Sequence, residues 1–422
     1  MSFPKQAGFK KRILIISAFY SPKIHVASNR AVAMAKYLKK AGFEVTVLSE
    51  FSGPELVSES LDQGIRVFYL SGLHWLNRES FLSRSFFPIH QIKVLKNKIL
   101  NFFLADDNPG FFYRFKHQMD SLASNQRIDL NKFDIILSTY APLSSHLIGL
   151  EIKKRFPRVT WVADFRDEMS FLPIGNFFLK NKLKKMESKI IEACDIVSTI
   201  SKPLLEQFKS TSPISEKKIF IEVRNGFDFQ LHQSSEVQRE VFKITYTGTF
   251  YGLRNPILFF EALKKFVKKY PLQNVSFDIY GGSRAEAIPK ELERIVIYHE
   301  KIKYERIREK LIDSSVLLLI EPSMGRVGGY TGKIFDYLAV NRPILAYIKQ
   351  NDVADELISL CKAGYVNRYY QVDEVFKTLD QLYQDWLKNQ IPDRNWVEVK
   401  KQSRENQINK LIEALNLFGV NK

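Results

Sequence analysis

The chain has 422 residues, 45% of them hydrophobic and 13% aromatic, so it is long enough for two domains and is not disordered as a whole. Its 63 lysines and arginines outnumber 46 aspartates and glutamates, and the net charge of +17 favours an anionic partner: nucleic acid, acidic lipid or a phosphorylated small molecule. Two cysteines, Cys194 and Cys361, indicate neither a disulfide framework nor a cysteine zinc site, and they fit a reducing compartment.

The chain opens with a strand–helix–strand pattern over 12–19, 27–41 and 43–48, which is typical of a Rossmann-like sheet. The first turn, YSPKIHVASNR, lacks the G-x-G-x-x-G fingerprint and so disfavours an oxidoreductase. Ser28 is expected to cap the helix, and Arg30 either reaches an anion there or stays solvated. No apolar run reaches the roughly 18 residues of a membrane span, so we expect a soluble or peripheral protein.

The alternating pattern stops between 72 and 126, where aromatic and basic residues are interleaved, most densely over 75–116. Such residues either pack against the core or bind acidic lipid or a lipid-linked acceptor. Stacking on single-stranded nucleic acid is disfavoured, because no nucleic-acid-binding motif accompanies them. We therefore expect peripheral contact with an acidic membrane through 75–116, and no nucleic acid.

Strands resume at 133–138 and 159–163, and the second is followed directly by Asp164, Arg166 and Asp167. Ligands of open α/β sheets bind beyond the carboxyl ends of strands, so these charges are either cleft residues or a structural Asp–Arg pair. The first half of the chain continues with a helix at 176–192 and strands at 195–200 and 218–223. The segment 229–240 is polar and aperiodic, and we interpret it as the interdomain linker.

A second series of strands and helices follows over 243–313 and leads into the stretch 315–347. There a buried strand (316–320) and a glycine-rich loop precede a helix that Thr331 is expected to cap, with Lys333 in its first turn and Asp336 one turn later. A lysine near a helix start attracts a phosphate, and the carboxylate can accept ribose hydroxyls. The alternative is an ordinary strand–helix–strand unit with a solvated Lys and Asp. Helices are expected over 352–360, 371–388 and 396–417.

Seven phrases occur in an order and spacing that resemble the GT-B glycosyltransferases of the family 4 type, most closely bacterial enzymes of surface polysaccharide assembly: ADDNPGFFY, STYAPLSSHLIGLEIKK, WVADFRDEMS, ACDIVSTISKPLLEQF, IEVRNGFD, ITYTGTFYGLRNPILFFEAL and TGKIFDYLAVNRPILAY. The resemblance covers nearly the whole chain and implies an α/β fold of two Rossmann-like domains facing across a cleft. We expect an acceptor-binding domain over 1–228, a nucleotide-sugar-binding domain over 240–395, and a C-terminal helix, about 396–422, that packs back on the first.

The resemblance also implies roles for single residues. Arg254 stands where the family meets the donor diphosphate, but Thr249 replaces an arginine that is often found after the glycine. Asp336 matches the carboxylate that holds the ribose, while Gly328 occupies the place of the family's other carboxylate. The donor set is therefore Gly248, Thr249, Arg254, Gly281, Gly329, Thr331, Gly332, Lys333 and Asp336, and the acceptor or cleft set is Ser28, Arg30, Asp164, Arg166 and Asp167.

The activity implied is transfer of a sugar from a UDP- or GDP-sugar to a glycan or lipid-linked acceptor, with retention and with no metal or cofactor, in lipopolysaccharide or capsule synthesis. The location implied is the cytoplasm, at the inner face of the plasma membrane. Arg254 and Lys333 would stabilise the leaving diphosphate, and Asp167 would orient the acceptor. One alternative is a catalytically silent GT-B module, suggested by Gly328 and Thr249. A sugar-nucleotide epimerase is disfavoured, because its chemistry needs several carboxylates and histidines in the cleft and the seven histidines of this chain are scattered along it.

Overall fold

The computed structural model describes residues 10–21, 26–51, 57–71, 109–124, 128–169, 177–211, 218–236, 240–270, 272–281, 287–321, 328–368, 371–391 and 393–420. Its contacts divide the chain into unit 1, Met1–Val223 with Ile408–Lys422, and unit 2, Arg224–Gln407. The division at Val223 differs from the expected linker at 229–240. The polar segment bonds instead inside unit 2, where the His232 amide donates to the Ala339 carbonyl at 2.9 Å.

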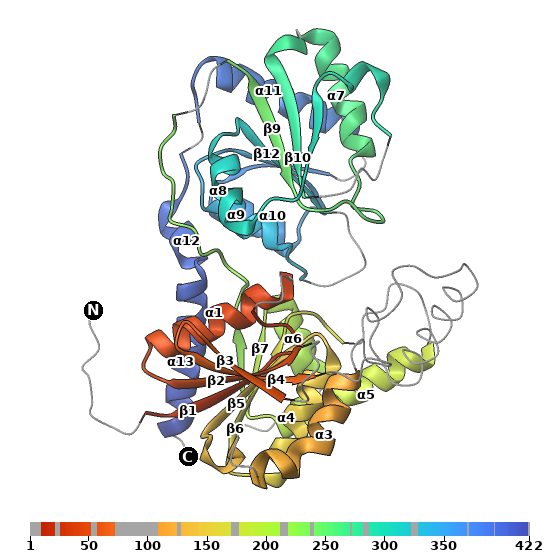
Figure 1. Cartoon of the computed structure of the whole chain (residues 1–422). Helices are drawn as coiled ribbons and strands as arrows, with labels where there is room; N and C mark the ends of the chain where they lie inside the picture. Colours follow the sequence, from red (N-terminus) through yellow and green to blue (C-terminus); the bar gives the residue numbers. More distant parts are fainter. Residues whose placement is uncertain are drawn as a thin grey trace. The chain divides into compact units, whose positions relative to one another are not determined.

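Unit 1 is built on an eight-stranded sheet of order β3-β4-β2-β1-β5-β6-β7-β8, in which only β3 runs antiparallel to its neighbour (Figure 1). The strands are β1 Arg12–Ile16, β2 Glu44–Phe51, β3 Val57–Asp62, β4 Ile65–Ser71, β5 Ile135–Tyr140, β6 Thr160–Phe165, β7 Ile196–Thr199 and β8 Ile219–Glu222. The β3–β4 hairpin was not expected from the sequence. Gln63 and Gly64 make its two-residue turn, with φ of 47° and 73°, the left-handed backbone of a type I′ turn.

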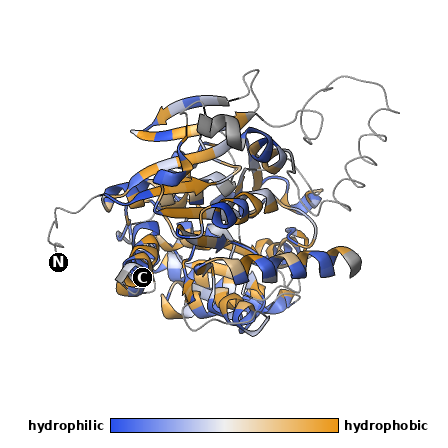
Figure 2. Cartoon of the chain, turned by 90° about the horizontal axis from the view of Figure 1, so that it is seen from below, coloured by the Kyte–Doolittle hydropathy of each residue, from blue (hydrophilic) through white to orange (hydrophobic). Residues whose placement is uncertain are grey.

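Helices cover both faces of this sheet, so its central strands β1, β5, β6 and β7 are buried on both sides. On β1, Leu14 and Ile16 belong to one hydrophobic core while Ile13 and Ile15 belong to another, as alternation along a strand requires. The helices are α1 Val26–Lys40, α3 Pro109–Ser124, α4 Leu143–Arg155, α5 Phe177–Ala193, α6 Lys202–Thr211 and most of α13 Arg404–Val420, with a 3₁₀ turn at Leu130–Lys132. Figure 2 shows hydrophobic residues running along the strands and hydrophilic residues on the outer helix faces.

Unit 2 contains a six-stranded, all-parallel sheet of order β11-β10-β9-β12-β13-β14. Its strands are β9 Phe242–Thr247, β10 Val275–Tyr280, β11 Val296–His299, β12 Val316–Glu321, β13 Ile344–Ile348 and β14 Gly364–Arg368. Its helices are α7 Ile257–Lys269, α8 Tyr304–Ile312, α9 Gly332–Leu338, α10 Val353–Leu360, α11 Val372–Leu387 and α12 Trp396–Lys401, with 3₁₀ turns at Leu272–Asn274 and Lys290–Leu292. The chain winds outward in one direction from β9 and in the other from β12, so these two central strands form the topological switch point.

The single helix expected over 396–417 is two helices, α12 and α13. The break occurs because the backbone of Phe227 pairs with this segment: its amide donates to the Gln402 carbonyl at 3.3 Å, and its carbonyl accepts from the Arg404 amide at 2.9 Å. Those groups are thereby withdrawn from helical hydrogen bonding. Among the described residues, no helix combines the length and the apolar character needed to cross a bilayer. Of the expected membrane-contacting stretch 75–116, residues 75–108 lie outside the described residues.

Candidate functional site

The predicted donor residues gather at the carboxyl ends of β9, β10 and β12 in unit 2. Gly248 follows β9 and Gly281 follows β10, and both have left-handed backbones with φ of 111° and 113°. The two glycines lie against each other, because a Cβ on Gly281 would stand 3.3 Å from the Gly248 Cα. A Cβ on Gly248 would stand 2.5 Å from the Lys333 Cε, so this glycine lets the lysine side chain cross the strand end.

Helix α9 carries Lys333 and Asp336, and Tyr337 fixes it against the sheet. The Tyr337 hydroxyl accepts a hydrogen bond from the Thr247 amide at 3.0 Å and donates one to the Leu318 carbonyl at 3.3 Å. One side chain thereby connects the helix to both strands of the switch point. Tyr337 was not predicted as a site residue, since a tyrosine inside a helix is more often a packing residue.

Buried Arg394 donates hydrogen bonds to backbone carbonyls at the C-terminal end of α9. Its guanidinium donates to the carbonyls of Tyr337 at 3.0 Å and Leu338 at 2.9 Å, and also to that of Val340. Tyr337 and Leu338 are the last two residues of α9, and the carbonyls of a final helical turn have no partner within the regular helix. Burial lowers the pKa of Arg394 to about 9, which still leaves the side chain charged at neutral pH. Together Tyr337 and Arg394 fix the orientation of α9, the helix that carries Lys333 and Asp336.

Arg254, Glu321 and Lys333 form one charged cluster at the switch point. The Arg254 Nη2 lies 3.2 Å from the Glu321 Oε1, and the Thr331 amide donates to the Glu321 Oε2 at 3.2 Å. The Arg254 Nη1 donates to the Tyr251 hydroxyl at 2.7 Å. Arg254 and Glu321 keep 14% and 18% of their side-chain surface exposed, so a ligand can reach the cluster. The sequence predicted both cations but not Glu321, since a glutamate that ends a strand carries no distinguishing pattern.

Burial governs the protonation of this cluster. It lowers the pKa of Lys333 to about 7, an effect to which the positive charge of Arg254 adds, while Glu321 and Asp336 oppose it. Burial likewise raises the pKa of Glu321 above its ordinary value, although Arg254 and Lys333 oppose that shift. An anionic ligand would favour the charged form of Lys333, so the cluster is suited to binding an anion such as a phosphate.

Asp336, the predicted ribose ligand, is already hydrogen-bonded. The Tyr304 hydroxyl donates to its Oδ1 at 2.6 Å, and the Arg404 guanidinium lies beyond, with its Nη2 3.4 Å from the Tyr304 oxygen. Burial raises the pKa of Asp336 to about 6 despite the opposing charge of Arg404. Contact with a ribose would use the second carboxylate oxygen or displace Tyr304, and the ribose role of Asp336 stays a prediction.

The remaining donor residues differ in how they are placed. Thr331 occupies the N-cap position of α9, but its side chain makes no capping hydrogen bond, which corrects the expected cap; its amide is directed at Glu321 instead. Thr249 is exposed, and its hydroxyl donates to the Gly281 carbonyl at 3.0 Å. A Cβ on Gly329 or Gly332 would meet nothing within 4 Å, so these two glycines border open space.

In unit 1, Arg30 and Asp164 bind each other. The Arg30 Nη2 and Nε donate to the two oxygens of Asp164 at 2.6 and 2.8 Å, and hydroxyls of Thr139 and Ser198 add bonds at 2.9 and 2.6 Å. Burial would raise the pKa of Asp164, but Arg30 and these hydrogen bonds hold it below its ordinary value. The pair is buried and saturated, so its arrangement matches the structural alternative of the sequence analysis.

The other acceptor candidates are divided between the interior and the surface. Ser28 was expected to cap the first helix. It is instead buried within α1, which begins two residues earlier at Val26, so that expectation was wrong. Arg166 donates to the carbonyls of Tyr140 at 2.5 Å and Ala141 at 3.0 Å, so it supports the loop after β5. Asp167 is partly exposed and is therefore the accessible carboxylate of the ADFRD stretch.

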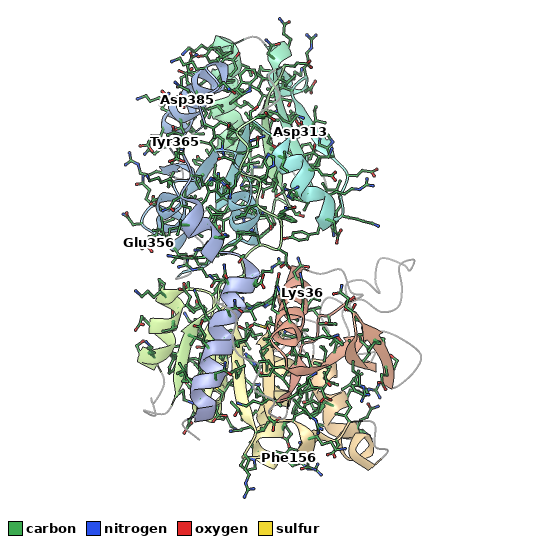
Figure 3. The ribbon with its side chains drawn as sticks, turned by 90° about the vertical axis from the view of Figure 1, so that its left-hand side faces the viewer. Lys36, Phe156, Asp313, Glu356, Tyr365 and Asp385 are labelled. Atoms are coloured by element: carbon green, nitrogen blue, oxygen red, sulfur yellow. The ribbon has the colours of Figure 1, made fainter. Side chains whose placement is uncertain are left out.

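A cavity of about 590 Å³ lies elsewhere in unit 1 and contains none of the predicted site residues. Its lining includes Lys11, Asp134, Phe156 and Thr160, which places it at the amino ends of β1, β5 and β6; Figure 3 labels Phe156 there. Within the part of the chain that the structure describes, no three His, Cys, Asp or Glu residues are grouped so that they could hold a metal ion.

No family model and no curated protein sequence matches this chain, but solved structures do. S. aureus TarM, in a mutant complex with fondaparinux, alpha-GlcNAc-glycerol and UDP, matches with a TM-score of 0.59 and 13% identity over 97% of this chain and 99% of that one. The trehalose 6-phosphate synthase of Burkholderia multivorans matches with a TM-score of 0.61 and 10% identity, over 98% of this chain and 99% of that one. An E. coli trehalose-6-phosphate structure bound with UDP-2-fluoro glucose matches with a TM-score of 0.59 and 12% identity, over 96% of this chain and 99% of that one. At these identities the likeness concerns the fold, and the chain has the GT-B fold of these glycosyltransferases.

Proposed function

We propose that the chain is a glycosyltransferase that moves a sugar from a nucleotide-sugar donor to a glycan or lipid-linked acceptor. The observation that carries the proposal is the meeting of Arg254 and Lys333 at the carboxyl ends of β9 and β12. A departing nucleoside diphosphate develops negative charge, and fixed cations stabilise it most effectively. Two structures with the same fold hold UDP or a UDP-sugar, which favours UDP over GDP as the nucleotide.

In this proposal Arg254 and Lys333 bind the two phosphates of the donor and stabilise them as the bond to the anomeric carbon breaks. The acceptor hydroxyl attacks with retention and passes its proton to the leaving phosphate, so no separate general base is required. Asp167 orients the acceptor. The independence from metals and cofactors, the role in cell-surface polysaccharide assembly and the location at the inner face of the plasma membrane remain predictions from the resemblance.

The test measures release of nucleoside diphosphate when the purified chain is incubated with a panel of UDP- and GDP-sugars, with and without glycan acceptors. Lys333→Met should lower kcat/KM at least about 100-fold. The reason is that losing one preorganised protein charge that stabilises a leaving group costs about 3 kcal/mol. Lys268→Met, an exposed lysine on α7, is the matched control and should leave turnover unchanged. Equal activity of the wild type and Lys333→Met would refute the assignment.

A second candidate is a catalytically silent GT-B module that binds a glycan or protein partner. Gly328 favours it, because the resemblance places a carboxylate of the donor site at this position and glycine has no side chain. The same panel separates the two candidates. A silent module consumes no donor under any condition, whereas the proposed enzyme releases nucleoside diphosphate with at least one sugar nucleotide.

A further inference from the structure

Glu321 is the one member of the charged cluster to which the sequence assigned no role. It is the last residue of β12, and its two carboxylate oxygens accept hydrogen bonds from the Arg254 guanidinium and the Thr331 amide, each at 3.2 Å. A phosphate bound to this cluster would be attracted by the same Arg254 guanidinium. The carboxylate of Glu321 therefore makes a contact with Arg254 that a phosphate oxygen would also make.

The groups facing Glu321 come from several elements. The cations are Arg254, in the turn after β9, and Lys333 on α9, while Asp352 at the start of α10 adds a negative charge. Asp336 acts on Lys333 from the next turn of α9. The uncharged titratable groups of the cluster are Tyr246, whose ring centroid lies 5.1 Å from the Lys333 Nζ, and Tyr251, which is hydrogen-bonded to Arg254.

Charge counting shows what a nucleoside diphosphate would meet. Two cations face the carboxylate of Glu321, so the trio carries a single net positive charge when Lys333 is protonated, and none when it is not. A diphosphate adds two to three negative charges beside a carboxylate that is already partly desolvated. Like charges in close contact favour protonation of the weaker acid, as does burial. The carboxylate can therefore remain beside the ligand at lowest cost by becoming neutral.

We propose that Glu321 is the resident anion of the diphosphate site, and that it takes up one proton from solvent when a nucleoside diphosphate binds. This inference rests on the proposed function, since it needs a diphosphate to enter the cluster. The proton moves from water to the carboxylate, and no bond of the ligand changes. The protonated carboxyl still accepts from the Thr331 amide, and its new O–H group donates to an oxygen of the ligand. The ionised form lies beside both Arg254 and Lys333 and offsets their mutual repulsion.

The experiment titrates UDP into the full-length protein by calorimetry at pH 8, in two buffers of different ionisation enthalpy, which reports the protons taken up. Lys333, with a pKa of about 7, contributes a proton of its own, so the informative quantity is the difference between variants. Glu321→Gln should reduce the uptake by about one proton and bind UDP about tenfold more tightly at pH 8, because a neutral amide does not repel the phosphates. Glu321→Asp, which keeps an ionisable group, should retain the uptake.

Glu374→Gln is the matched control, because Glu374 pairs with Arg368 on the surface of α11, outside the cluster; neither uptake nor affinity should change. Unchanged proton uptake in Glu321→Gln would overturn the proposal, and so would a folded Glu321→Gln protein that binds UDP more than tenfold more weakly, since Glu321 would then only position Arg254. Failure of the wild type to bind UDP or GDP would be a different result, because it would refute the proposed function itself.

Discussion

Two arginine–carboxylate pairs lie near the carboxyl ends of parallel strands, one pair in each sheet, and they differ in how completely their hydrogen-bonding groups are paired. Arg30 and Asp164 of unit 1 share two hydrogen bonds of 2.6 and 2.8 Å, and the Asp164 side chain is 0% exposed. Arg254 and Glu321 of unit 2 share one bond of 3.2 Å, remain partly exposed and have Lys333 beside them. A saturated, buried pair is not available to a ligand, whereas an accessible pair with an additional cation can take up an anionic ligand.

The largest expected effect tests the structural half of this comparison. Asp164→Ala leaves the Arg30 guanidinium buried without its carboxylate, so it should lower the free energy of unfolding by about 3–5 kcal/mol. Urea denaturation measures the loss. The double variant Arg30→Met with Asp164→Leu removes both charges and should recover most of the stability. A loss below about 1 kcal/mol for Asp164→Ala would mean that the pair does not support unit 1.

The second prediction concerns the glycine beside the cation cluster. Gly248→Ala adds a methyl group where the Lys333 Cε lies and strains a backbone with φ of 111°, so it should weaken UDP binding about 10- to 100-fold and cost about 1–3 kcal/mol of stability. Calorimetry measures the first quantity and denaturation the second.

Gly252→Ala is the control for backbone strain alone, since Gly252 also has a positive φ, of 54°, but no neighbour within 4 Å of an added Cβ. It should cost about 1 kcal/mol of stability and leave UDP affinity within about threefold. Equal losses of affinity in the two variants would show that strain, rather than displacement of Lys333, disturbs the site.

The smallest expected effect concerns Asp336. Its pKa in the folded protein is about 6, against an ordinary 3.8, so ionisation opposes folding. The penalty is absent below about pH 4, where both states are protonated, increases as the pH rises through 6, and is constant above it. Asp336→Asn should therefore stabilise the protein by about 1–3 kcal/mol at pH 8 and have no effect near pH 3.5. Thermal unfolding at the two pH values measures this; a destabilisation at pH 8 would show that the ionised carboxylate is held favourably by Arg404.

The order of strands and helices could largely be predicted from apolar runs and glycine positions, as could the convergence of Gly248, Arg254 and Lys333 on one sheet edge. Elements with weak patterns were missed: β14 has only one buried residue among Gly364–Arg368, and the β3–β4 hairpin depends on the left-handed pair Gln63–Gly64. The roles of Tyr337 and Arg394 were also missed, because each depends on contacts with distant carbonyls or amides.

By itself, the sequence determined the class of fold and the kind of charge at each strand end, because buried strands, turn glycines and charged residues at strand ends are local patterns. Only the tertiary structure decided which charges are available to a ligand. Arg30 and Asp164 lie 134 positions apart and neutralise each other, while Glu321 meets Arg254 across 67 positions and leaves Lys333 as an additional cation. Burial, distance and competing partners determine whether a charge stabilises the fold or binds a substrate, and all three arise only when the chain is folded.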